Sequence, residues 1–223
     1  MHVPDGFIGG AVSAGAAAAA VAGLTVAVKR AGDEIDEGRA PLTGLVAAFV
    51  FAAQMITVPI AAGTSGHLIG GVLAAVLVGP WAAAICLAVV VVVQALFADG
   101  GLTALGLNVV NLSLVTTLGG YGIFAALRAL LPQRRMLPAA AGIAAGLSVL
   151  LASTAFVAEY ALGGRGGADP GAVLAAMTGV HALIAAGEAV VTAGAVSALL
   201  AVRPDLVHAA GGREPAVVAE GLA

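Results

Sequence analysis

Residues 171–202 read GAVLAAMTGVHALIAAGEAVVTAGAVSALLAV, and this stretch decides the fold class. Glu188 is its only residue with a formal charge, and His181 is its only histidine. A helix needs roughly 20 consecutive apolar residues to cross the hydrocarbon core of a bilayer. We therefore predict a membrane-spanning helix here, long enough to tilt or to project into the cytoplasm.

Six similar apolar runs precede this stretch. They lie at about residues 10–28, 41–58, 67–78, 80–98, 104–131 and 136–161. The run at 67–78 is short and Pro80 forces a break after it, so we expect this helix to cross only part of the bilayer. The runs together predict an all-α fold, an integral membrane bundle of about seven transmembrane helices. Residues 1–203 are expected to form one transmembrane domain, and residues 204–223 a short cytoplasmic tail.

The composition of the whole chain supports a membrane protein. Its 223 residues are 61% hydrophobic and only 9% charged. A soluble domain of this size has too little interior to bury so much apolar surface. The net charge of -3 favours neither a nucleic-acid partner nor a polybasic lipid anchor. Cys86 lies inside an apolar run, where we expect it to act as a small packing residue.

The basic residues predict the orientation of the bundle. Cytoplasmic loops of membrane proteins carry an excess of Lys and Arg. With seven spans and the N-terminus outside, only Arg165 falls outside. The residues that then fall inside are Lys29, Arg30, Arg39, Arg128, Arg134, Arg135, Arg203 and Arg213. We therefore expect a multi-pass protein of a bacterial-type cell membrane, with its N-terminus outside and its C-terminus in the cytoplasm.

The chain begins MHVPDGFIGG, and its first two residues offer three nitrogen donors to a metal ion. The α-amine of Met1 and the amide nitrogen of His2 close a five-membered chelate ring, and that amide and Nδ1 of His2 close a six-membered one. Planar nitrogen sites suit Ni(II) or Cu(II), and Co(II) is possible. His67, in the outer loop after the second helix, is the expected fourth donor. We thus predict a metal-binding N-terminal segment at residues 1–9, folded back into the mouth of the bundle at Pro4 and its glycines.

Simpler interpretations stand beside this one. His2 and His67 could each be an ordinary hydrogen-bonding histidine. Asp99 and Glu159 could be charges at helix ends near the interface, and His181 a hydrogen-bonded interior histidine. If a metal site exists, the groups expected to surround and orient its ligands are Asp99, Asn108 and His181. His181 and Glu188 stand seven residues apart and so share one face of their helix.

Five blocks of the sequence resemble one known family. The blocks are MHVPDGF (1–7), GTSGHLIGG (63–71), LVGPWAA (77–83), QALFADGGLTALGLNVVN (94–111) and GVHALIAAGEAVVT (179–192). They are similar, in the same order, to the CbiM/NikM family, the substrate-specific membrane components of energy-coupling factor (ECF) transporters for cobalt and nickel. The resemblance implies seven helices, an outward N-terminus, and a metal held by the Met1 amine, the His2 amide and imidazole, and His67.

The resemblance also implies partners. Family members work with a transmembrane coupling protein, a pair of cytoplasmic ATPases and often a small accessory membrane subunit. Some members carry a C-terminal extension that replaces the accessory subunit, and we expect a separate accessory chain here. The chain has no GxxxxGK[ST] phosphate loop, so we expect ATP hydrolysis by the partners and no enzymatic activity of its own. No cofactor is expected, since Ni2+ or Co2+ would be the transported substrate.

Two alternatives remain open from the residues alone. GTSG at 63–66 fits the GxSG motif of rhomboid intramembrane proteases, with Ser65 as nucleophile and His181 as base. Against it, the motif falls in an expected outer loop, far from His181 along the chain. A self-sufficient secondary cation transporter is the other alternative, but the expected membrane interior is poor in acidic groups and no repeat is visible. The choice between nickel and cobalt also stays open, because four planar nitrogens would serve either ion.

Overall fold

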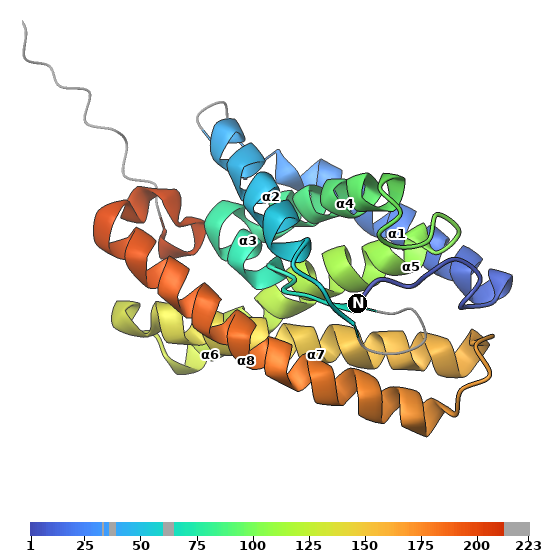
Figure 1. Ribbon diagram of the computed structural model, residues 1–223. Coiled ribbons are helices and arrows are strands. Elements are labelled where there is room, and N and C mark those ends of the chain that lie inside the picture. The colour runs from blue at the N-terminus through green and yellow to red at the C-terminus, as the bar shows by residue number, and fades with distance from the viewer. Residues whose placement is uncertain (33, 36–38, 60–64, 212–223) are drawn as a thin grey trace, which may run out of the picture.

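The computed structural model describes residues 1–32, 34–35, 39–59 and 65–211 (Figure 1). Over this part of the chain the fold is helical, apart from one antiparallel pair of two-residue strands, β1 (Val58–Pro59) and β2 (Ser65–Gly66). The helices are α1 (Gly10–Ala31), α2 (Ala40–Gln54), α3 (Gly71–Val78), α4 (Pro80–Leu96), α5 (Leu105–Asn108), α6 (Gly120–Leu130), α7 (Leu137–Gly163) and α8 (Pro170–Val202). A π-helical segment, Val109–Gly119, joins α5 to α6 without a break, so the described residues form seven separate helical rods at the seven predicted places.

Four of these rods are long and apolar enough to cross a membrane. They are α1, the continuous α5–α6 rod, α7 with its preceding 3-10 turn, and α8. The helices α2 and α4 are equally apolar but shorter, with 15 and 17 residues. The all-helical prediction is thus confirmed, and four of the seven predicted spans meet the length that a bilayer requires.

The short helix α3 lies in the centre of the bundle. All eight of its residues are buried. It ends at Gly79, whose φ of +98° is a backbone conformation that a side chain would oppose, and Pro80 then begins α4. A helix too short to span a membrane is tolerated at this depth because protein surrounds it. The break predicted at Pro80 is confirmed.

Helices α7 and α8 lie side by side along most of their length (Figure 1). Glycines on α7 allow the close approach: a Cβ added at Gly142 would lie 2.6 Å from the carbonyl oxygen of Ala189, and one at Gly146 would lie 3.0 Å from that of Ala185. Small residues at such positions let helix backbones pack closely in membranes. This packing fixes α8 beside the bundle core, with His181 and Glu188 both buried.

The two ends of the described chain both pack against the bundle. The N-terminus lies in its interior, near α3 and α5 (Figure 1), and Met1 is fully buried. Residues 204–210, expected to be part of a polar tail, form two 3-10 turns, and Val207 between them is also fully buried. The rest of the predicted tail, from residue 212, lies outside the described residues.

Candidate metal site at the N-terminus

The first residues are tied to the loop and helix that follow α4. The backbone N–H of Val3 donates to Oδ1 of Asn108 at 2.7 Å, and Nδ2 of Asn108 donates back to the carbonyl of Val3 at 3.1 Å. The N–H of Gly101 donates to the same carbonyl at 2.9 Å. Both polar backbone groups of Val3 are therefore satisfied, and the two residues before it are held at a fixed place in the interior.

Further contacts hold the rest of the segment. Oδ1 of Asp5 accepts from the backbone N–H of Thr103 at 2.7 Å and from its hydroxyl at 2.6 Å. These bonds lower the pKa of Asp5 below its ordinary value of 3.8. On the opposite side, the N–H of Arg165 donates to the carbonyl of Phe7 at 2.9 Å, and the Phe7 ring packs against Tyr160 with centroids 5.1 Å apart. The segment is thus clamped between the α4–α5 and α7–α8 connections.

His67 approaches the N-terminus from the opposite direction. It follows β2 directly, and its side chain is 2% exposed. Its Nδ1 lies 2.8 Å from the carbonyl oxygen of Leu68. Because a carbonyl can only accept, Nδ1 carries the proton and Nε2 presents its lone pair. The rings of His67 and His2 lie with their centroids 4.8 Å apart, tilted by 32°.

Three of the four ring nitrogens of these two histidines lack hydrogen-bond partners in the described part of the protein. This holds for both Nδ1 and Nε2 of His2 and for Nε2 of His67, all of them buried. Oδ2 of Asp99 lies 3.7 Å from Nε2 of His2. A buried polar atom left unpaired costs about 1–3 kcal/mol. Such a group calls for an explanation, and a bound ion is one.

Burial also keeps these donors uncharged. Desolvation lowers the pKa of the Met1 amine to about 4 and that of the His2 imidazole to about 3. It lowers the pKa of His67 as well. At neutral pH all three groups are therefore uncharged, which is the state that metal ligands require.

The other residues singled out in the sequence have different surroundings in the structure. Asp99 lies near the His2 imidazole, with no hydrogen bond formed between the two side chains. Asn108 contacts the backbone of Val3 instead of an imidazole. His181 is fully buried, with Nδ1 2.8 Å from the carbonyl of Met177 and with no hydrogen-bond partner for Nε2 among the described residues. Glu159 accepts a bond from Asn111 at 2.7 Å.

The predicted donor set differs from a site built of side chains alone. Among the described residues, no three His, Cys, Asp or Glu side chains gather closely enough to hold a metal ion. Only two of the predicted donor residues, His2 and His67, contribute side chains, and the other donors belong to the main chain at Met1 and His2. Ser65, the nucleophile of the protease alternative, lies in β2 with its side chain outside the described part.

Three buried polar residues near the candidate site are not predicted as part of it from the sequence. Glu188 and Gln54 both bond to the backbone at Ile69, two residues after His67. Gln94 on α4 is fully buried, and neither polar atom of its side chain has a hydrogen-bond partner in the described chain. The available signal was the cost of placing an amide or a carboxylate within an apolar run.

Comparison with known proteins places the chain in a family. A family model described as the cobalt uptake substrate-specific transmembrane region, CbiM, matches residues 2–206. The chain belongs to this family. The resemblance seen in the five sequence blocks is thereby confirmed.

Individual members agree with this assignment over almost the whole chain. A putative metal transport protein of Haloquadratum walsbyi is 37% identical over 93% of either chain. A putative fused nickel transport protein NikMN of Archaeoglobus fulgidus is 38% identical over 93% of this chain and 68% of its own length. The crystal structure of a truncated transition metal transporter superposes with a TM-score of 0.84 at 32% identity, covering 90% of this chain and 99% of that one. This CbiM-family chain is therefore a membrane component of cobalt or nickel transport, which points away from the protease alternative.

Proposed function

We propose that this chain is the substrate-binding membrane subunit of an ECF-type importer of Ni2+ or Co2+. In this proposal the α-amine of Met1, the amide nitrogen and imidazole of His2, and Nε2 of His67 form a square-planar site for the transported ion. The accompanying coupling protein, the two ATPases and a small accessory membrane subunit belong to the same proposal.

One observation carries the site assignment. The rings of His2 and His67 meet in the interior beside the buried N-terminus, and both ring nitrogens of His2 and Nε2 of His67 have no hydrogen-bond partners among the described residues. Ordinary interior histidines hydrogen-bond with both ring nitrogens or leave one to solvent. Here the nitrogens without hydrogen-bond partners include Nδ1 of His2 and Nε2 of His67, which the proposed planar site would use. An ion at this place would satisfy them.

The proposed orientation rests on one end of the bundle. Arg30 at the end of α1 lies over the ring of Trp81 at the start of α4, 5.5 Å from its centroid. Arg39, just before α2, approaches Nδ1 of His208 at 3.4 Å. In the proposed orientation this end faces the cytoplasm, because Lys and Arg are in excess on the cytoplasmic side of membrane proteins. The N-terminal segment then enters from outside, where a substrate-capturing subunit meets its ion.

The identity of the ion is proposed at the level of a class. Planar nitrogen coordination favours Ni(II) slightly over Co(II) in the Irving–Williams order. The family description names cobalt, and the Archaeoglobus fulgidus relative is named for nickel. Metal analysis of protein purified from cells supplied with both ions decides between them.

The sharpest test concerns the first atom of the chain. Adding one residue before Met1, or acetylating its amine, removes a donor without changing a side chain. We expect nickel and cobalt binding and uptake to collapse in both cases, with mass spectrometry verifying the N-terminus. A tag at the C-terminus is the control and should leave binding unchanged. Normal metal uptake by the extended protein would refute the site.

A further inference from the structure

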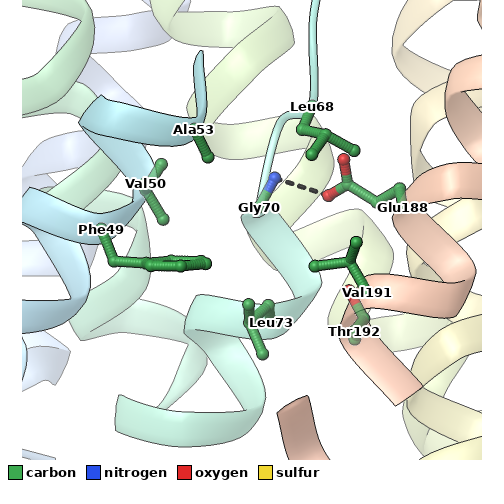
Figure 2. Close-up of a pocket in the computed structure, with 9 residues that line it drawn as sticks. All are labelled: Phe49, Val50, Ala53, Leu68, Gly70, Leu73, Glu188, Val191 and Thr192. Carbon is green, nitrogen blue, oxygen red and sulfur yellow. Dashed lines mark hydrogen bonds between the residues drawn. The ribbon is translucent and has the colours of Figure 1, made fainter. Parts of the chain in front are cut away.

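A buried carboxylate on α8 holds the backbone of the segment that carries His67. Oε2 of Glu188 accepts from the N–H of Ile69 at 2.6 Å, and Oε1 accepts from the N–H of Gly70 at 2.5 Å. Figure 2 shows the Glu188 side chain reaching from α8 to Gly70 at the start of α3. Glu188 is 2% exposed, so neither bond competes with bulk water.

The same segment is held from its other side by α2. Nε2 of Gln54 donates to the carbonyl of Ile69 at 2.7 Å, so both backbone polar groups of Ile69 are occupied by side chains. Gly70 has a φ of +78°, and a Cβ added there would lie 2.9 Å from Cγ2 of Val50. A glycine is therefore required at this position for two separate reasons. The backbone two and three residues after His67 has almost no freedom to shift.

The space around this contact offers no easy substitute for Glu188. A small apolar pocket of about 20 Å³ lies between α2, α3 and α8, lined mainly by hydrophobic side chains such as Phe49, Leu73 and Val191 (Figure 2). That volume holds one water molecule at most. If the carboxylate were removed, two buried N–H groups at the start of α3 would lose their acceptors.

We propose that Glu188 is the positioning residue of His67, fixing its imidazole at the place where it meets the transported ion. This inference rests on the proposed function. The contact requires a carboxylate, because the two neighbouring N–H donors of Ile69 and Gly70 need two acceptor oxygens. A glutamate supplies both, while a glutamine turns one of them into an NH2 group that opposes an N–H. An aspartate is one methylene shorter and cannot reach both.

The test is a double-mutant cycle with His67. We expect Glu188→Ala to weaken nickel binding by about 10–100-fold, the usual effect of losing a group that orients a metal ligand. The absorption spectrum of its nickel form should shift from that of the wild type toward that of His67→Ala, because the fourth nitrogen is displaced in one protein and removed in the other. In the His67→Ala background, Glu188→Ala should have no further effect on affinity. Glu188→Gln, which has the same shape, should fold and show a smaller loss in the same direction.

Glu159→Ala is the control, since this half-buried carboxylate on α7 bonds to Asn111 and to no part of the His67 segment among the described residues. It should keep the wild-type nickel spectrum. Equal losses in both His67 backgrounds, or an unchanged spectrum in Glu188→Ala and Glu188→Gln, would overturn the positioning role. If His67→Ala and the N-terminally extended protein bind nickel normally, the proposed function itself has failed, so the two failures are distinguishable.

Discussion

His2 and His67 come from separate segments, yet their rings lie 4.8 Å apart inside the bundle. Each segment is anchored on its own side: Val3 is bonded to Asn108, and Ile69 is bonded to Glu188. Neither histidine holds the other in place, since no hydrogen bond between them is formed among the described residues. The approach of the two rings is therefore fixed by the surrounding backbone, and such preorganisation is what the proposed site needs to be selective.

Replacing His67 should remove one of the four proposed donors. We expect His67→Ala to lose more than about 100-fold in nickel affinity, beyond the usual effect of residues that only orient a ligand. Calorimetric titration of the purified protein measures it. His208→Ala, which removes a histidine that contacts Arg39 at the opposite end of the bundle, serves as the control and should bind as wild type. Unchanged binding by His67→Ala would make His67 the wrong fourth ligand.

The nickel-loaded protein should have the properties of a planar four-nitrogen complex. We expect a diamagnetic, yellow-orange species, because four strong donors in one plane favour the low-spin state of Ni(II). Absorption spectroscopy and magnetic measurement check this directly. A green, paramagnetic octahedral form would exclude the planar geometry.

Asn108 should affect nickel affinity only indirectly, by holding the backbone of Val3 next to the proposed donors. In Asn108→Ala the buried N–H of Val3 loses its acceptor, while its carbonyl keeps the bond from Gly101. We expect nickel affinity to fall about 10–100-fold, since the residue next to the chelate is released. Asn111→Ala, one helical turn further on and bonded to Glu159, should change the affinity much less. Equal titration curves for the two variants would argue against this role of Asn108.

The bond between Asp5 and Thr103 should weaken at acid pH. The folded state lowers the pKa of Asp5 below 3.8, so the bond's stabilising effect is complete above that value and is lost as pH falls through the lowered pKa. Hydrogen exchange at the Thr103 amide, corrected for its intrinsic rate, should be constant from about pH 5 to 8 and faster below about pH 4.

Asp5→Asn is the control for this pH dependence. It keeps a side-chain oxygen that can accept from Thr103 but has no proton to gain. Its Thr103 amide should therefore exchange at a rate that, after correction, does not depend on pH over the same range. A wild-type protein with the same flat profile would contradict the assignment of the acid effect to Asp5.

The helices could be predicted from the sequence because a bilayer leaves the backbone few choices. Spanning segments must satisfy their own N–H and C=O groups, so apolar runs translate directly into helices. The end of the second helix differs from its prediction. The apolar run extends over 41–58, but α2 ends at Gln54, and Val58 and Pro59 pair with β2 instead. The π-helical segment Val109–Gly119 was not predicted, since its shifted hydrogen-bond pattern leaves no clear hydrophobic period.

The candidate site was predictable only where chelate chemistry is local. The adjacent amine, amide and imidazole of Met1 and His2 can be recognised from two letters of sequence. His67 was expected because few histidines were available at the outer end, and the structure brings it to His2. Glu188 gave no such signal. Its partners are backbone groups 118 and 119 positions away, and side-chain periodicity says nothing about a distant backbone.

The wide separation of these contacts has a consequence for biosynthesis. The partner of Val3, Asn108, is synthesised 105 positions later, and the partner of Ile69, Glu188, is synthesised 119 positions later. Because a chain leaves the ribosome from its N-terminus, the first two residues are made long before the helix that holds them, and α8 is inserted last. A nascent chain halted before α8 would lack the bonds from Glu188 to Ile69 and Gly70, so the segment that carries His67 would not be held in place. If the proposed metal site is right, tight metal binding would be confined to molecules whose synthesis has finished, and an incomplete subunit would not withdraw scarce metal ions.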